Sequence, residues 1–331
     1  MLGAIVDTSL GDDEFHEDST THSLQAYVAG LVGHEASLLV LSGTMGNQVA
    51  IRAALRSPPY SLVADNRAHV ATYGAGGMST ICGAVIKPVM PSNGHHLTLD
   101  DVQRHSTTTE TMYDYPTRVI SLENTLLGTI MPLADARAIS QWARSQTPPI
   151  HMHLDGARVW EAVAAGAFTL REIAQCFDSM QLCLAKGIGA PLGSVVVGSS
   201  RFIERARWSR HFMGGGMRAS GIIAAPARVA IDNVFLGGKL KRPQEMARRA
   251  SALWEQLGGK LLVPTETNMV VLNLEASGLA PLEFHVMARK FGVKTMDLVG
   301  ARIVFHYQVS EDSFQRLCDL FEAIMTQGSR V

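Results

Sequence analysis

Short apolar runs alternate with amphipathic segments from about residue 22 to residue 200. Seven runs rich in Val, Ile and Leu have the length of β-strands. They are residues 37–41, 61–64, 84–90, 118–122, 150–154, 179–184 and 194–197. Segments with apolar residues at helical spacing lie between them, among them residues 48–55, 133–145 and 159–165. This alternation predicts an α/β fold built on a mostly parallel seven-stranded sheet that is covered by helices on both faces.

The pattern changes after the glycine-rich stretch at residues 213–217. Two long helices are predicted over residues 219–235 and 243–257, and shorter β and α segments follow them. We therefore predict three parts, which are an N-terminal arm over residues 1–15, a large domain over residues 16–232 and a smaller α+β domain over residues 233–331.

Composition narrows the range of partners. Of the 331 residues 47% are hydrophobic and 18% are charged, and the formal net charge of −1 gives no basic surface for nucleic acid. No apolar run reaches transmembrane length, the first residues do not resemble a signal peptide, and the four cysteines show no disulfide or zinc spacing. We expect a cytoplasmic protein with a small-molecule partner and neither a nucleic-acid nor a membrane partner.

Two motifs have weaker functional interpretations. The glycines of Gly187-x-Gly189-x-x-x-Gly193 do not match the dinucleotide-binding spacing, and they are more typical of tight turns. His151, His153 and Asp155 alternate along a predicted strand, which places them on one face. A metal site remains an alternative there, but a catalytic zinc needs further ligands that the sequence does not offer nearby. We therefore expect no metal.

Two other groups of residues point to a cofactor with a phosphate and a carbonyl. Residues 42–47 form a small-residue turn between a predicted strand and helix, where free backbone N–H groups bind anions. Lys186 ends an apolar strand, where desolvation would make its amine a nucleophile. Asp155 and Arg158 end another strand at the same edge of the sheet. A phosphate cradle, an amine and a carboxylate for a ring nitrogen together predict pyridoxal 5'-phosphate.

Ordered motifs along the chain resemble those of the threonine aldolase family, the β-eliminating lyase-like branch of the aspartate aminotransferase fold, and fungal members in particular. The motifs are Gly11-Asp12-Asp13-Glu14-Phe15, Ser42-Gly43-Thr44-Met45, Arg67-Ala68-His69, Glu123-Asn124-Thr125, His153-Leu154-Asp155-Gly156-Ala157-Arg158, Lys186-Gly187-x-Gly189-Ala190-Pro191-x-Gly193 and Gly214-Gly215-Gly216-Met217-Arg218. The resemblance implies a pyridoxal-phosphate enzyme of fold type I that forms a homotetramer, as a dimer of dimers.

The resemblance also implies a role for each matching residue. Lys186 would bind the cofactor as a Schiff base, and Asp155 would pair with the ring nitrogen. The phosphate would be bound by Ser42, Gly43 and Thr44, with Arg218 reaching in from a neighbouring subunit. His69 would stack over the cofactor ring and serve as, or orient, a base near the substrate hydroxyl. Arg158 and Arg302 would hold the substrate carboxylate, and Arg158 is also expected near the cofactor.

Two departures from the family pattern affect the expected function. The family normally has a Ser-Asp-Thr segment upstream of Gly11-Asp12-Asp13, so we expect the N-terminal arm to be shortened. A histidine normally follows Glu123-Asn124-Thr125, but this chain has Leu126-Leu127, and Leu127 would make that wall of the substrate site apolar.

The motifs and the departures from them are compatible with three functions. The first is aldol cleavage of L-threonine or L-allo-threonine to glycine and an aldehyde. The alternative is a pyridoxal-phosphate alanine racemase, as in fungal peptide biosynthesis, because an apolar wall suits a methyl side chain better than a hydroxyl. A catalytically silent protein with the cofactor fold is the third.

Overall fold

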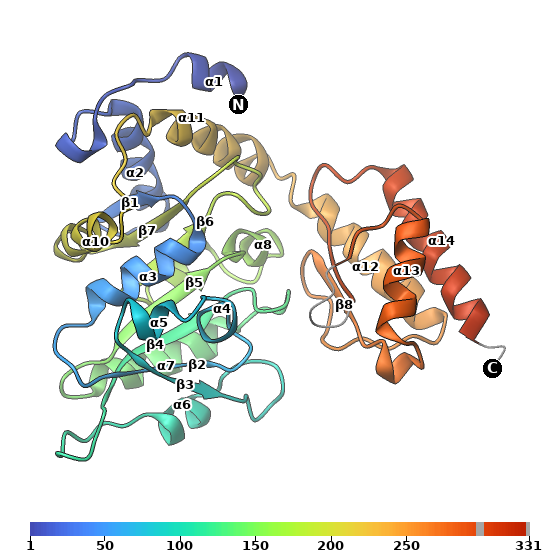
Figure 1. The fold of residues 1–331 in the computed structure, drawn as a ribbon, viewed down its shortest axis with the longest axis horizontal. Helices are drawn as coiled ribbons and strands as arrows, with labels where there is room; N and C mark the ends of the chain where they lie inside the picture. The colour runs from blue at the N-terminus through green and yellow to red at the C-terminus, as the bar shows by residue number, and fades with distance from the viewer. Residues whose placement is uncertain (296–300, 329–331) are drawn as a thin grey trace. The chain divides into compact units, whose positions relative to one another are not determined.

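A computed structural model describes residues 1–295 and 301–328 of the chain. The chain forms two compact units (Figure 1). The first consists of residues 1–126 and 131–237, and the second of residues 127–130 and 238–331. Among the described residues, no helix combines the length and the hydropathy of a transmembrane span.

The first unit is built on a seven-stranded sheet in the order β1-β7-β6-β5-β4-β2-β3. Its strands are β1 (Ala36–Val40), β2 (Ser61–Asp65), β3 (Val85–Val89), β4 (Thr117–Glu123), β5 (His151–Gly156), β6 (Ser179–Cys183) and β7 (Ser194–Gly198). Only β7 runs against its neighbours, and the other strands share one direction. The predicted α/β fold with a mostly parallel seven-stranded sheet is confirmed.

Helices cover both faces of this sheet (Figure 1). The helices of the first unit are α1 (Leu2–Val6), α2 (Ser19–Val32), α3 (Gly43–Ala54), α4 (His69–Thr72), α5 (Gly77–Thr80), α6 (Leu99–His105), α7 (Leu133–Ser145), α8 (Val159–Ala164), α9 (Leu170–Ala174), α10 (Ser200–Phe212) and α11 (Gly221–Ala230). A 3-10 turn, Asp13–Phe15, precedes α2, and the π-helix Ile231–Leu236 continues α11. Because side chains alternate along β1, Leu38 and Val40 pack with α3 and α10 on one face of the sheet.

One helix begins earlier than predicted. The pattern places its start at residue 48, whereas α3 begins at Gly43 with Ser42 as its N-cap. Ser42 Oγ accepts a hydrogen bond from Met45 N at 3.1 Å. The small residues that resemble a turn in the sequence therefore form the first turn of the helix, because the cap satisfies one of its free N–H groups.

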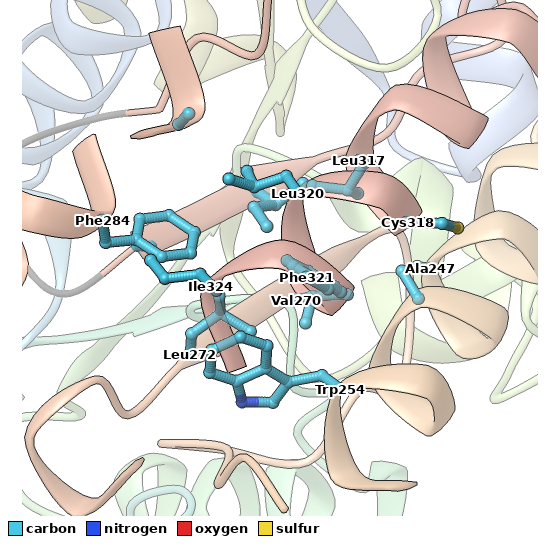
Figure 2. Packing of buried hydrophobic residues seen from close by; sticks show 14 of the residues in the cluster. Ala247, Trp254, Val270, Leu272, Phe284, Leu317, Cys318, Leu320, Phe321 and Ile324 are labelled. Atoms are coloured by element: carbon cyan, nitrogen blue, oxygen red, sulfur yellow. The ribbon is translucent and has the colours of Figure 1, made fainter. Parts of the chain in front are cut away.

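The second unit has a hydrophobic core of its own (Figure 2). Its elements are α12 (Lys241–Gln256), β8 (Met269–Leu272), the 3-10 helix Glu275–Ser277, α13 (Pro281–Lys290), β9 (Ala301–Val304) and α14 (Glu311–Gly328). The rings of Trp254 and Phe321 lie 4.9 Å apart at 59°, and Phe284 meets Trp254 edge-on at 6.2 Å. Such aromatic contacts add to the burial of apolar area that holds the unit together.

A buried ion pair ties the N-terminal segment to α10. Arg210 Nη2 donates to Asp13 Oδ2 at 2.8 Å, and neither side chain is exposed to solvent. Arg210 Nη1 donates to the carbonyl oxygen of Leu39 at 3.0 Å, and Arg207 lies 3.3 Å from the same Asp13 oxygen. Arg210 Nη2 also lies 3.2 Å from Glu14 Oε1, but Glu14 is partly exposed, so removal of Asp13 takes away the only fully buried counter-charge that the described residues give Arg210.

We expect Asp13→Ala to lower the free energy of unfolding by about 3–5 kcal/mol, because Arg210 would stay buried without its main counter-charge. Asp100→Asn is the control, because Asp100 pairs with Arg104 at the surface and should cost less than about 1 kcal/mol. Urea unfolding followed by circular dichroism measures both values. Equal losses in the two variants would contradict a structural role for the buried pair.

Candidate active site

A cavity of about 330 Å³ lies in the first unit, where strands β5 and β6 give way to loops. Its wall brings together the start of α3, the start of α4, the end of β5 and the loop after β6. The lining residues are Leu41, Ser42, Gly43, Thr44, Asn47, His69, Asp155, Gln181, Cys183, Ala185, Lys186, Leu192 and Gly193. Six residues that the sequence predicts for the site, Ser42, Gly43, Thr44, His69, Asp155 and Lys186, therefore share one cavity.

Asp155 is held as a buried hydrogen-bond acceptor on β5. Its side chain is only 2% exposed, and Oδ2 accepts from Asn47 Nδ2 at 2.6 Å. Oδ1 accepts from the backbone N–H of Ala157 at 3.0 Å. The side-chain amide of Gln181 is oriented so that its donors and acceptors match those around it. In this orientation Nε2 donates to Asp155 Oδ1 at 3.0 Å, and Oε1 accepts from Cys183 N and Ser194 Oγ. Donors of this kind stabilise a buried charged carboxylate.

Behind this acceptor lies a second row of polar contacts. His153 Nε2 is 3.1 Å from Asn47 Oδ1, and His153 Nδ1 is 2.9 Å from Ser179 Oγ. Burial lowers the pKa of His153 to about 3, so the ring is neutral. The neutral ring donates from Nε2 to the side-chain oxygen of Asn47. This hydrogen bond fixes the Asn47 amide so that its nitrogen points toward Asp155. His153 thus orients Asp155 through Asn47.

The first turn of α3 forms an anion cradle. The N–H of Met45 bonds to the cap, and that of Gly46 bonds to the Ser42 carbonyl oxygen. The N–H groups of Gly43 and Thr44 have no acceptor among the described residues. A Cβ at Gly43 would lie 3.3 Å from the Gln181 side chain, so a larger residue would crowd the cradle. Free N–H groups at the positive end of a helix dipole bind phosphate well.

Lys186 and His69 supply the basic groups. The side chain of Lys186 makes no hydrogen bond or ion pair within the described part of the chain, and it is exposed, not buried as expected. The difference arises because β6 ends at Cys183, so Lys186 stands on the loop beyond the strand. His69 is half-buried, and burial lowers its pKa, with the charge of Lys186 acting in the same direction and Asp155 opposing it. A neutral imidazole can accept a proton.

Glu123 brings a second carboxyl group, with no role predicted from the sequence, to the same edge of the sheet. It ends β4 in register with Asp155 on β5, so the two carboxyl groups lie on the same face of the sheet. Glu123 Oε2 accepts from the backbone N–H of His69 at 2.8 Å. Burial and the negative charge of Asp155 raise the pKa of Glu123 to about 8. Glu123 therefore keeps a proton at neutral pH while it positions His69.

Other predicted residues lie elsewhere. Arg158 is the N-cap of α8 and is not among the described residues that line the cavity. Arg218 is 70% exposed and pairs with Asp12 of the same chain. Leu127 and Arg302 belong to the second unit, where Leu127 has a φ of 52° and Arg302 lies on β9. Their contact with a substrate stays a prediction.

The sequence alone predicts no role for Asn47, Gln181 and Glu123. Asn47 lies within the predicted turn at residues 42–47, and Glu123 lies in the motif Glu123-Asn124-Thr125. The sequence therefore indicates that both are near the site, but it does not indicate their hydrogen-bond partners. Gln181 sits in an apolar strand, where a buried polar residue is itself a signal that it bonds to something specific.

The β-eliminating lyase family model matches residues 1–277 of the chain. An aldolase named vrtJ from Penicillium aethiopicum is 49% identical over 99% of this chain and 83% of its own length. A low-specificity L-threonine aldolase from Eremothecium gossypii is 40% identical over 96% of this chain and 82% of its own. The alanine racemase TOXG of Cochliobolus carbonum is 38% identical over 98% and 84%.

The fold has a counterpart among solved structures. The Leishmania major threonine aldolase superposes with a TM-score of 0.77 at 19% identity, and the match covers 93% of this chain and 90% of the other. The fold is therefore that of the pyridoxal-phosphate enzymes of fold type I.

Because the pKa of Glu123 is raised in the folded state, we predict that the free energy of unfolding depends on pH differently in the wild type and in a variant without this carboxyl group. Its folded-state pKa of about 8 lies above the ordinary 4.5, so its stabilising contribution is complete below pH 4.5 and is lost as the pH rises through 8. Glu123→Gln imitates the neutral carboxyl group and keeps an acceptor for His69 N. We expect the variant, relative to the wild type, to gain about 3 kcal/mol of unfolding free energy between pH 5.5 and pH 8.5.

Urea unfolding at the two pH values measures this gain on protein without added cofactor. The exposed Glu255 provides the control, because Glu255→Gln makes the same chemical change away from the cavity. A wild-type-to-variant difference that is the same at both pH values would show that Glu123 is ionised throughout.

Proposed function

Because the chain belongs to the β-eliminating lyase family, in the group that contains the fungal threonine aldolases, we propose that it is a pyridoxal-phosphate lyase. Its proposed reaction is the cleavage of L-threonine or L-allo-threonine to glycine and acetaldehyde. The observation that carries the proposal is the single cavity that holds Lys186, Asp155, His69 and the free N–H groups of α3.

The residues present fit the cofactor. Gly43 and Thr44 would hold its phosphate with their N–H groups, and Ser42 caps the same turn. Asp155, charged and fixed by Asn47 and Gln181, would hold the proton of the ring nitrogen. Lys186 offers an amine with no competing partner among the described residues. When bound, pyridoxal phosphate supplies an electron sink for a bond broken at Cα.

His69 is the proposed base for the substrate hydroxyl. Its lowered pKa keeps the ring neutral at physiological pH, so it can accept the proton that the hydroxyl loses as Cα–Cβ breaks. Glu123 fixes the backbone of His69 and, because it is protonated, adds no negative charge beside Asp155. We also propose that Arg158 and Arg302 bind the substrate carboxylate, since a guanidinium pairs with a carboxylate through two hydrogen bonds.

Alanine racemisation is the second candidate. It requires proton removal at Cα and no base for a hydroxyl. Leu126-Leu127 stands where the aldolase pattern has a histidine, and TOXG, a relative at 38% identity, is named an alanine racemase. The aldolase proposal comes first because His69 lines the cavity and can take the hydroxyl proton.

We further propose a cytoplasmic dimer of dimers. Trp208 and Phe212 stack on α10 at 5.7 Å and are each 61% exposed, which suits a surface covered by another subunit. Arg218, also exposed, would then be free to exchange Asp12 for the phosphate in a neighbouring site.

The substrate assay separates the candidates. Purified protein loaded with pyridoxal phosphate is incubated with L-threonine, L-allo-threonine and L-alanine. Chiral chromatography follows the amino acids, and coupled alcohol dehydrogenase follows acetaldehyde. We expect equal amounts of glycine and acetaldehyde from a threonine isomer and no D-alanine. Formation of D-alanine without aldehyde would establish the racemase instead, and no turnover of any substrate would favour the silent protein.

Lys186 is expected to carry the cofactor. Borohydride reduction of the loaded enzyme should attach the cofactor to Lys186 in a peptide map. Lys186→Ala should lose the visible absorption band and the activity, whereas the exposed Lys239→Ala should keep both. Attachment at any other lysine would overturn the assignment of the cavity.

A further inference from the structure

A second cavity, of about 580 Å³, lies at the opposite edge of the same sheet. It is formed where α3 ends and where β2, β4 and β5 begin, so it lies at the amino ends of the strands, away from the cavity of Asp155 and Lys186. Its lining residues are Ala54, Arg56, Ser57, Tyr60, Arg118, Pro148, Pro149, Ile150, His151, Asp178 and Arg205. None of them has a role in the proposed reaction.

Several arginines gather around this cavity, and those without an ion-pair partner among the described residues outnumber the carboxylates of its lining. Arg56, Arg201 and Arg205 form no ion pair in the part of the chain that the structure describes. Burial lowers the pKa of Arg205, and the charges of Arg56 and Arg201 lower it further. The Nε atom of Arg205 is buried and has no hydrogen-bond partner among the described residues. These arginines repel one another, and a buried donor without an acceptor is costly.

The other polar groups of the lining do not neutralise them. Glu110 forms an ion pair with Arg118, so the Glu110 carboxylate does not serve as a counter-charge for Arg56 or Arg205. Asp178 lies 3.8 Å from Arg144 and accepts from Met152 N at 2.8 Å. Burial lowers the pKa of His151 to about 4, so this ring is neutral and rests 2.8 Å from Ser179 Oγ. An excess of positive charge is therefore left on the cavity.

The carbonyl end of α3 explains only part of this arrangement. Arg56 follows the end of α3, where the negative pole of the helix dipole favours a cation. Arg205 belongs to a different helix, α10, and Arg118 belongs to β4. A helix-capping role therefore accounts for Arg56 but not for the convergence of three arginines on one cavity.

We infer that this cavity binds a small anion with two or more negative charges, either a phosphate compound or a polycarboxylate. Guanidinium groups bind both kinds of oxyanion through paired hydrogen bonds. Arg56 and Arg205 would contact the charged group, and Arg205 Nε would gain its missing acceptor. Tyr60, Pro149 and Ile150 would contact an apolar part of the ligand. The site is separate from the catalytic cavity and does not depend on the proposed reaction.

Calorimetric titration tests this inference on the enzyme loaded with pyridoxal phosphate, so that the cradle of α3 is filled. Sodium pyrophosphate and sodium citrate are the two probes, and they distinguish a phosphate ligand from a polycarboxylate. We expect at least one to bind, and Arg205→Gln and Arg56→Gln each to weaken that binding about tenfold or more. Arg104→Gln, the same charge change at the surface, should alter it less than about twofold.

Thermal unfolding separates binding from a structural role. The bound probe should raise the melting temperature of the wild type but not that of Arg205→Gln, and without probe the variant should be no less stable, because repulsion is relieved. Arg205→Lys keeps the charge and should retain part of the binding. The inference is overturned if neither probe binds the wild type, if Arg205→Gln and Arg56→Gln bind as tightly as Arg104→Gln, or if the bound anion displaces the cofactor absorption.

Discussion

The candidate active-site cavity is organised around one buried carboxylate, that of Asp155. A carboxylate removed from water is strongly disfavoured unless donors surround it, and Asn47, Gln181 and the N–H of Ala157 provide them here. These donors come from α3, β6 and the loop after β5, so the packing of three elements is fixed by one side chain. The same packing places the first turn of α3, with its free N–H groups, beside Lys186.

The two carboxyl groups at the ends of β4 and β5, those of Glu123 and Asp155, differ in their surroundings and therefore in their protonation. Asp155 accepts from three donors, whereas Glu123 accepts from the backbone N–H of His69, and burial beside Asp155 favours the protonated form of Glu123. Asp155 is thus left as the carboxylate that would face the ring nitrogen of the proposed cofactor, and the lowered pKa of His69 leaves its ring neutral and able to accept a proton. Enzymes assign acid and base roles to adjacent titratable groups through such differences in pKa.

Sequence patterns were sufficient for the fold and for the residues that stand at strand ends. Lys186, Asp155 and Ser42 to Thr44 follow apolar runs, and parallel strands bring such positions to one edge. The partners Asn47, Gln181 and Glu123 could not be assigned because their contacts depend on strand order and register; Asn47 and Asp155, for example, are 108 residues apart. The start of α3 was predicted too late, since the glycines that leave room for a ligand also weaken the helical pattern.

The protonation of the cofactor ring is the most direct test of this account. Nitrogen-15 NMR of the enzyme loaded with ring-labelled pyridoxal phosphate reports whether the ring nitrogen carries a proton. With Asp155 charged and held by Asn47 and Gln181, we expect a protonated nitrogen with a one-bond N–H coupling at pH 8. An unprotonated nitrogen in the wild-type enzyme would contradict the account, because the buried charge around which the cavity is organised would then have no partner.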